Sequence, residues 1–360
     1  MSDRRRALAC ASALALALPA RAQLRPAPHA RCVVTAHVAV APDDPADPLA
    51  PPALLPLDGI TVVAWRDRAG ALLVQRFAAD LRALDEPRVL AQPVRIFTLA
   101  RTPTGFALAY VERERELVVA RRSASMEAQN VPRVVEALRS PVTSLSLVPV
   151  AGASLLAWST PEAVRVMALD ARGVPRAPAS VALEQPGARS VGLDPAERAT
   201  LRVDAIDPSV EPWVLTLQPD GAVASRARWP IGALGPVRLG GVAFTAQINP
   251  LGSPMLLRSS VAAPPSAIAD PAVAPRARLD ALAVDGELAV AMVSDPVSGR
   301  QSLARLLPDG SASWLTGVRG AIPGRSSIAV LAPGTVLLLT RDAAHSPPRT
   351  TLQRYVCTLP

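Results

Sequence analysis

The sequence is poor in the residues that most binding and catalytic sites use. It contains no lysine, three histidines and three cysteines among 360 residues, and aromatic residues make up 3% of the chain. The net charge of +8 comes from arginines that are spread along the chain among acidic residues. Proteins that bind nucleic acids concentrate their basic residues in a stripe or patch. The lack of such a stripe predicts that nucleic acid is not a partner.

Few residues are available to hold a metal or a cofactor. No two of the three histidines, His29, His37 and His345, have the spacing of metal ligands. The chain also has no Gly-x-Ser-x-Gly elbow, no phosphate-binding loop and no dinucleotide fingerprint. We therefore expect neither a metal nor a cofactor.

Long apolar runs are missing, apart from one near the N-terminus. Ala7–Leu18 is an uncharged run of twelve residues, whereas a helix that crosses a membrane needs about twenty. The run follows three arginines and precedes Pro19 and Ala20-Arg21-Ala22. This order predicts a signal peptide over residues 1–22, a flexible leader over 23–31 and no transmembrane segment. The mature protein is then exported, to the periplasm, the cell surface or the extracellular space.

What the sequence does contain is a repeat. A turn that usually includes glycine leads into an apolar strand that ends near a bulky residue, as in LDGITVVAW (Leu57–Trp65) and VAGASLLAW (Val150–Trp158). Seven such strands occur, and the fourth and fifth are weak copies. The bulky residues, here called anchors, lie 45, 48, 45, 42, 47 and 48 positions apart: Trp65, Tyr110, Trp158, Val203, Thr245, Met292 and Thr340.

The remainder of each repeat also has the pattern of strands. A polar loop follows the anchor, and a second strand often ends in a tight-turn signal such as Asp170–Gly173 or Pro219–Gly221. Four short strands in a unit of this length are typical of a β-propeller blade. We therefore expect an all-β chain that forms one propeller of seven four-stranded blades over residues 32–360. Six or eight blades, a solenoid and a pair of β-sandwiches remain alternatives.

The pattern resembles that of secreted bacterial β-propeller repeat proteins, in the broad style of WD-type and kelch-type propellers. The resemblance covers nearly all of the chain after residue 22, and it is architectural. A WD dipeptide at the expected place, the kelch glycines and the quinoprotein tryptophan motif are absent from the sequence. PDGSASW at Pro308–Trp314 is similar to a sialidase Asp-box, but its glycine directly follows the aspartate and it occurs once. The resemblance implies a fold and no particular activity.

Two cysteines lie at opposite ends of the predicted propeller. Cys357 falls where the third strand of the last blade should turn into a fourth, but the chain ends three residues later. RCVVTAHVAV, which contains Cys32, has the length and β-branched content of one strand. We expect residues 32–40 to close the ring as that fourth strand, with a Cys32–Cys357 disulfide and a linker over 41–52. Export to an oxidising compartment favours such a bond.

The loops that follow the anchors are the candidate binding site. In propellers these loops gather on one face around the central channel, and here they carry acidic residues, namely Asp67, Glu112, Asp207, Asp295 and Asp342. The favoured hypothesis is a monomeric, non-catalytic binding or scaffold propeller whose ligand is a protein or a glycan. The alternative is a hydrolase or lyase that uses two carboxylates at the channel mouth, roughly 5–10 Å apart as in glycoside hydrolysis.

Overall fold

The computed structural model of the chain describes residues 32–41, 50–150, 152–194, 199–205 and 213–228. Beyond residue 228 it describes 234–239, 242–248, 254–260, 263–268, 278–285, 288–294, 301–306, 312–318, 327–332, 334–342 and 349–357. Within these ranges every regular element is a β-strand, and none of the described residues forms a helix that could cross a membrane. The signal peptide and leader predicted over residues 1–31, and most of the linker, lie outside the described residues.

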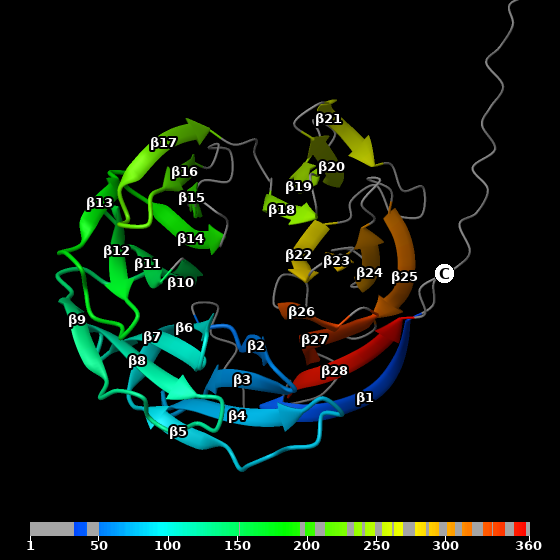
Figure 1. Cartoon of the computed structure of the whole chain (residues 1–360), viewed down its shortest axis with the longest axis horizontal. Helices are drawn as coiled ribbons and strands as arrows, with labels where there is room; N and C mark the ends of the chain where they lie inside the picture. The colour runs from blue at the N-terminus through cyan, green and yellow to red at the C-terminus, as the bar shows by residue number, and fades with distance from the viewer. Residues whose placement is uncertain are drawn as a thin grey trace, which may run out of the picture.

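The described strands form seven antiparallel sheets of four strands, arranged around a central space (Figure 1). We number the sheets 1 to 7 in chain order and give each from its innermost to its outermost strand. Sheet 1 is β2 (Ala53–Leu57), β3 (Ile60–Arg66), β4 (Leu72–Ala78) and β5 (Arg88–Ala91). Sheet 2 is β6 (Val94–Thr102), β7 (Gly105–Glu112), β8 (Glu116–Ser123) and β9 (Arg133–Ala137). Sheet 3 is β10 (Ser144–Val150), β11 (Ala153–Ser159), β12 (Val164–Asp170) and β13 (Ser180–Leu183).

The remaining four sheets have the same order of strands. Sheet 4 is β14 (Ala188–Asp194), β15 (Thr200–Ala205), β16 (Trp213–Leu217) and β17 (Val223–Arg228). Sheet 5 is β18 (Leu234–Leu239), β19 (Val242–Ile248), β20 (Pro254–Ser260) and β21 (Ala263–Ile268). Sheet 6 is β22 (Arg278–Asp285), β23 (Leu288–Ser294), β24 (Gln301–Leu306) and β25 (Ala312–Val318). Sheet 7 is β26 (Ser327–Ala332), β27 (Thr335–Asp342), β28 (Arg349–Cys357) and β1 (Cys32–Ala41).

The second strand of every sheet contains the predicted anchor, so the repeat in the sequence corresponds to the repeat in the structure. Trp65 and Trp158 are almost completely buried, because β3 and β11 each have apolar side chains on both of their faces. A strand that is covered on both faces has a continuous apolar sequence, whereas a strand at the outer edge has exposed positions, as β5 and β9 do. Tyr110, Val203, Met292 and Thr340 are buried as well, so these anchors mark the buried centres of their sheets.

The hydrophobic core lies between neighbouring sheets. One buried cluster joins sheets 1 and 2 and includes Phe106 and Met126, and others join sheets 2 and 3, 3 and 4, 6 and 7, and 7 and 1. Innermost strands of neighbouring sheets contact one another from sheet 1 to sheet 4 and from sheet 5 to sheet 7, and β2 of sheet 1 contacts both β6 and β26. The strands β14 and β18 of sheets 4 and 5 lie further apart in Figure 1. This side-by-side arrangement differs from the coil of a solenoid and from the face-to-face sheets of a sandwich.

The two ends of the described chain meet in sheet 7. Strand β1 pairs with β28 in antiparallel register, with Cys32 opposite Cys357, and the two cysteines form a disulfide. The side chains of Val40, Leu337 and Leu352 from this sheet pack with Trp65 of sheet 1. The predicted pairing of the cysteines is therefore seen in the structure, and the predicted strand 32–40 extends by one residue, to Ala41.

The connections between third and fourth strands repeat in detail. Each forms a short loop in which one residue has a left-handed backbone conformation, and these residues are Leu81, Met126, Gly173 and Gly221 in sheets 1 to 4. The N–H of that residue donates to the carbonyl three positions earlier in all four loops. The Asp-Gly turn predicted at Pro219–Gly221 and the turn at Asp170–Gly173 belong to this set, whereas residues 308–310 lie outside the described residues.

Candidate functional site

The site predicted from the sequence lies at one end of the sheets, where the second strand of each sheet passes into the third. We call this end the loop face. In sheets 1 to 3 it comprises residues 67–71, 113–115 and 160–163, together with the connections to the next sheet at 92–93, 138–143 and 184–187. The opposite end, which has the loops with left-handed residues, is called the turn face. Of the five predicted residues, Asp67, Glu112 and Asp342 are described, and Asp207 and Asp295 lie outside the described residues.

Asp67 holds the turn between β3 and β4. Its Oδ1 accepts a hydrogen bond of 2.8 Å from the backbone N–H of Ala71, and its own N–H donates to the Ala71 carbonyl over 3.0 Å. The Asp67 carbonyl accepts from the N–H of Gly70, whose positive φ of 80° suits glycine. Asp67 is half-buried, and its carboxylate accepts a hydrogen bond from the backbone of its own turn. The sequence predicts that Asp67 contacts a ligand, whereas the structure shows its carboxylate holding its own turn.

Glu112 ends β7 and precedes the turn at residues 113–115. The carbonyl of Glu112 accepts from the N–H of Arg115 over 3.1 Å, and Arg113 and Glu114 have φ of 48° and 62°. Two successive positive φ values define the type I′ turn, whose twist matches that of the flanking strands. The side chain of Glu114 is 71% exposed at the tip. Arg113 and Glu114 are thus held in fixed positions with their charged groups in solvent.

The Glu112 carboxylate also acts on the neighbouring anchor. Burial raises the pKa of the Tyr110 hydroxyl, the nearby Glu112 raises it further, and Arg122 acts in the opposite direction. Tyr110 lies in the cluster between sheets 1 and 2. Its hydroxyl is therefore neutral at physiological pH, so it does not supply a negative charge or a general base to this face.

Asp342 is the last residue of β27 and lies opposite Arg349 of β28. Both residues are thus at the loop-face end of sheet 7. The structure places Asp67, Glu112 and Asp342 at corresponding ends of sheets 1, 2 and 7, which are neighbours because β2 contacts both β6 and β26. That these residues bind a ligand stays a prediction.

Two loop-face turns are linked by the backbone to the chain at the next sheet boundary. The carbonyl of Gly70 accepts from the N–H of Val94, the first residue of sheet 2, over 2.8 Å. In sheet 3 the carbonyl of Pro161 accepts from Gly187, which directly precedes sheet 4, over 2.9 Å. In sheet 2 the carbonyl of Arg115 accepts from Leu138 over 2.7 Å, which holds the turn to the end of β9 in the same sheet. These bonds fix the tips of the turns relative to their neighbours without using a charged side chain.

Charged side chains extend these links across the first boundary. Arg66 donates from Nη1 to the carbonyl of Arg95 over 3.0 Å, and Arg95 forms an ion pair of 3.3 Å with the Oε1 of Glu114. Arg95 lies in the innermost strand β6. Its part in this face could not be predicted from the sequence, because an arginine in an inner strand lies outside the loops after the anchors and carries no motif.

Glu162, like Arg95, is a charged residue of the loop face that was not among the residues predicted from the sequence. It is exposed in the turn after β11, and its Oε1 accepts a hydrogen bond of 3.1 Å from Ser140 in the preceding connection. Hydrogen bonding by Thr160 lowers the pKa of this carboxyl most, Ser140 lowers it further, and desolvation opposes them. The sequence signal that could have identified Glu162 is its position four residues after the anchor Trp158, in the loop that follows that strand. Glu162 therefore carries a full negative charge on the loop face of sheet 3.

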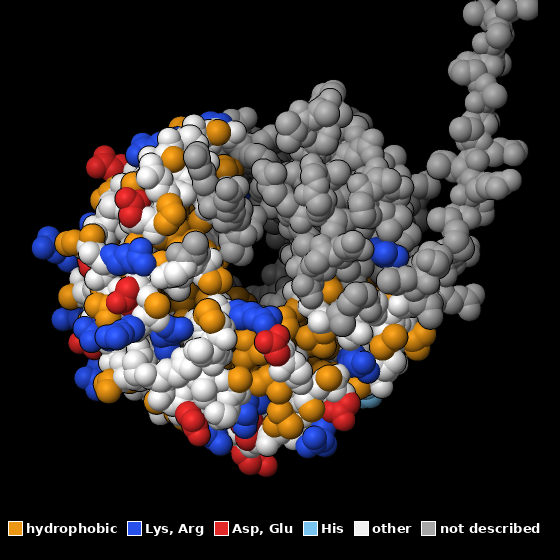
Figure 2. Space-filling view, in the orientation of Figure 1, with side chains coloured by type: hydrophobic (Ala, Val, Ile, Leu, Met, Phe, Trp, Pro, Cys, Tyr) orange, Lys and Arg blue, Asp and Glu red, His pale blue; other side chains and the backbone are white. Residues whose placement is uncertain are grey.

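The described charges of the loop face are dispersed. The acidic groups come from different sheets, and Asp67 is used by its own turn. Within the described ranges no three His, Cys, Asp or Glu residues gather in a way that could hold a metal ion. Figure 2 shows arginine and acidic side chains interspersed over the described part of the surface. A fixed arrangement of positive and negative side chains can complement the charges of a partner. Such complementarity gives specificity, because a partner with another charge pattern binds less well.

Comparisons with known proteins identify the fold but no family. No family profile and no characterised protein sequence matches the chain. Among solved structures, the chain is similar to BBS1N in its complex with ARL6DN, with 12% identity and a TM-score of 0.55 over 91% of this chain and 97% of that one. It is similar to the WD40 domain of Toxoplasma gondii coronin, with 11% identity and a TM-score of 0.54 over 92% and 89% of the two chains. It is also similar to the BP39L lectin of Burkholderia pseudomallei, with 12% identity and a TM-score of 0.57 over 82% and 93%. The chain therefore has a β-propeller-like fold of the kind found in WD40 domains.

Proposed function

We propose that the protein is an exported, monomeric seven-bladed propeller that binds a protein or a glycan through its loop face and has no catalytic activity. In this proposal each four-stranded sheet is one blade, and the addition of β1 to sheet 7 closes the ring. The observation that carries the proposal is that backbone hydrogen bonds hold the loop-face turns of sheets 1, 2 and 3 to neighbouring segments, namely Gly70 to Val94, Arg113 to Pro93 and Pro161 to Gly187.

Fixed turns lower the cost of binding. When a ligand binds a flexible loop, the loop loses conformational entropy, and this loss weakens binding. A turn that is held at both ends already keeps its side chains in position, so less entropy is lost. Glu114 and Glu162 are exposed on such turns, and Arg95 pairs with Glu114 from the inner strand. The contact surface proposed here also includes Glu112, Asp342 and the loops that contain Asp207 and Asp295.

The structural neighbours are consistent with a binding role. BBS1N was solved in complex with ARL6DN, and BP39L is a lectin. Both examples use a propeller-like frame, one with a protein partner and one with a name that denotes a sugar-binding protein. At 12% identity they support the fold and serve only as an analogy for the function.

Export is proposed because a disulfide between Cys32 and Cys357 persists only where thiols are oxidised. The predicted signal peptide over residues 1–22 would provide the route. A periplasmic, cell-surface or extracellular protein must then stay folded without the help of cytosolic chaperones. The covalent link between the two terminal strands suits that requirement.

The test compares the two faces. Purified protein is applied to a glycan array, and a photo-crosslinking residue at Arg113 captures protein partners in the envelope of the producing cells. The ligand found in either way is then titrated against the double variant Glu114→Arg/Glu162→Arg. We expect its affinity to fall roughly tenfold or more, because reversing two charges in a complementary interface opposes the ligand's own charges.

The matched control is Glu127→Arg. Glu127 is exposed on the turn face, and it contributes its backbone N–H, not its carboxylate, to the hydrogen bond with Ser123. Reversal of this charge should leave binding unchanged. All variants should melt within a few degrees of the wild type, since exposed substitutions usually cost about 0.5 kcal/mol or less. Loss of binding in Glu127→Arg, with binding retained in the double variant, would place the site on the turn face and reject the proposal.

A further inference from the structure

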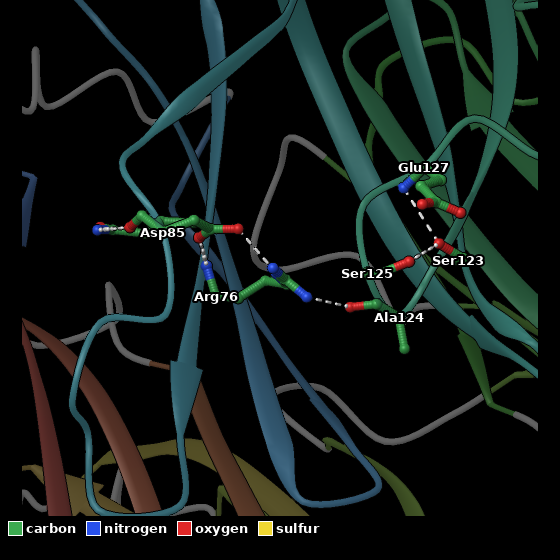
Figure 3. A network of polar contacts seen from close by, with 7 residues as sticks. Arg76, Asp85, Ser123, Ala124, Ser125 and Glu127 are labelled. Carbon is green, nitrogen blue, oxygen red and sulfur yellow. Dashed lines mark hydrogen bonds and ion pairs between the residues drawn. The ribbon is translucent and has the colours of Figure 1, made fainter.

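The outermost strand of sheet 7 is held differently from the outermost strand of sheet 1. In sheet 1 that strand, β5, follows β4 along the chain, and Asp85 fastens the loop between them (Figure 3). Asp85 Oδ2 pairs with Nε of Arg76 over 2.7 Å, and Asp85 Oδ1 accepts from the backbone N–H of Arg76 over 3.0 Å. The Nη1 of Arg76 also donates to the carbonyl of Ala124 in sheet 2 over 3.0 Å. The outer part of sheet 1 is thus held by its own loop and by the next sheet.

In sheet 7 the outermost strand, β1, comes from the other end of the chain. It pairs with β28, and Cys32 and Cys357 lie opposite each other at the turn-face end of this pair, 325 residues apart in sequence. The disulfide therefore occupies the place where sheets 1 to 4 have a loop between the third and fourth strands. A loop keeps its two strands in one molecule under all conditions, whereas a disulfide does so only after oxidation.

The side chains of β1 add little to this hold. Cys32 and Val40 are buried near its two ends, and between them Ala36 and Val38 are half-buried and the other positions are exposed. Two irregularities of register interrupt the pairing with β28. The hydroxyl of Thr35 donates to the carbonyl of Arg354 and accepts from its Nη1, each over 3.3 Å, which is long for a hydrogen bond. Without the disulfide, β1 therefore separates from β28 more easily than a central strand separates from its neighbours.

The length of chain between β1 and sheet 1 sets how far β1 can reach. Ala50 is buried in the cluster that joins sheets 1 and 2, and residues 42–49 separate it from Ala41 at the end of β1. A chain of this length spans up to about 30 Å when it is extended. Residues 42–49 include three prolines and three aspartates, a composition that favours an extended chain. A reach of this order allows β1 to pair with sheet 7 of a second molecule that lies alongside.

We propose that two copies of the chain exchange their first strands, so that β1 of each copy pairs with β28 of the other and Cys32 bonds to Cys357 between the copies. The edge of β28 is then occupied by a second copy of β1, and the structure already shows within one chain how these two strands fit. The closed monomer and the exchanged dimer contain the same strand pairs, so concentration decides between them. In dilute solution the closed monomer is favoured, because the short connection gives β1 a high effective concentration at its own β28.

The exchange has one consequence for binding, and this consequence rests on the function proposed for the loop face. An exchanged dimer carries two loop faces, so a ligand with repeated sites is held by both of them at once and dissociates more slowly. The exchange itself involves β1 and β28 and needs no ligand. The two proposals therefore stand or fail separately.

The test uses two full-length variants that cannot form the bond within one chain. Cys32→Ser keeps Cys357 and Cys357→Ser keeps Cys32, so a bond between these cysteines forms in a mixture only between copies. Cys10→Ser is added to every protein, which leaves no other thiol. The mixture is held a few degrees below the unfolding midpoint with reduced and oxidised glutathione, in a dilution series. Each bond forms from two thiols, while one oxidised glutathione is reduced to two glutathione molecules.

We expect a covalent dimer in non-reducing electrophoresis, with a yield that rises with protein concentration, and peptide mapping should find Cys32 joined to Cys357. A matched control measures random collision between thiols. The variant Cys32→Ser/Cys357→Ser/Glu127→Cys carries its thiol at an exposed position of the turn face and is mixed with Cys32→Ser (Figure 3). Its yield of dimer should be roughly tenfold lower, because only a thiol on β1 is brought opposite Cys357 by strand pairing.

Hydrogen exchange separates strand exchange from incidental capture. In the covalent dimer, residues 32–41 should be as protected as in the oxidised wild type, because β1 is again paired with β28. Cys10→Ser protein that keeps both Cys32 and Cys357, when reduced and then reoxidised at high concentration, should give the same dimer, so the result does not depend on the folding of either serine variant. The proposal is overturned if the mixture gives no more dimer than the control, or if residues 32–41 of the dimer are unprotected.

Discussion

Removal of the Cys32–Cys357 disulfide should loosen the junction between the two ends of the chain. The double variant Cys32→Ser/Cys357→Ser keeps the register of β1 against β28 but loses a link across a sequence separation of 325 residues. In the chain-entropy account, closing a loop of this length stabilises the fold by about 5.8 kcal/mol at 25 °C. Unfolding entropy of about 2.1 cal/mol/K per residue, over roughly 330 residues, converts this value into a midpoint lowered by about 8 °C.

The measured loss should be somewhat smaller, because the hydrogen bonds and side chains of β1 remain. Val40 still packs with Leu352 and Trp65 in the cluster between sheets 7 and 1. We therefore expect a fall of about 4–8 °C in calorimetry. Hydrogen exchange should show lost protection over residues 32–41 first, since β1 is the outermost strand of its sheet.

Dithiothreitol provides the matched control. It should lower the midpoint of the wild type to that of the double variant and leave the double variant unchanged. Equal midpoints for wild type and variant, with equal protection of β1, would refute the argument that the bond stabilises this junction. Alkylation of both thiols in the native, unreduced protein would show that the bond is absent.

Three further predictions follow from single positions. Gly105→Ala should lower the free energy of unfolding by several kcal/mol in chemical denaturation, because a Cβ there would overlap the carbonyl of Arg122; a change of less than about 1 kcal/mol would contradict this. Burial raises the pKa of Tyr355 from 10.0 to about 12, so the folded state holds the phenolic proton more tightly than the unfolded state does. The free energy of unfolding should therefore fall as the pH rises from about 10 to 12, and Tyr355→Phe should reduce that fall. An equal fall in both proteins would count against this assignment. Mass spectrometry of exported protein should find Gln23 at or near the N-terminus, and an intact Met1 would reject the signal peptide.

The repeat could be predicted because the same physical requirement recurs in each unit. The second strand of a sheet lies between two neighbouring sheets, so it needs a bulky apolar residue, and Trp65, Tyr110 and Trp158 satisfy that need at nearly constant spacing. The pairing of Cys32 with Cys357 followed from counting strands, since a last unit with three strands requires a fourth from elsewhere. Periodic burial and strand number are thus readable from a single sequence.

The details of the loops could not be read in this way. Leu81 and Met126 adopt left-handed conformations that sequence patterns assign to glycine or asparagine, because each fills a space against the preceding sheet. Asp67 looks like a ligand-binding acid in the sequence, and only its hydrogen bond to Ala71 reveals a turn. Polar residues in loops serve the turn or a ligand, and the backbone geometry decides which.

The pairing of β1 with β28 has a consequence for how the chain is made. The strand β1 is synthesised more than three hundred residues before its partner, β28. Until then β1 presents two unpaired edges and its exposed valines, Val33 and Val34. Such a distant contact is formed late and slows folding. Sheet 7 is therefore completed only after the residues up to Cys357 have been made, and before that its first strand is open to pairing with the edges of other chains.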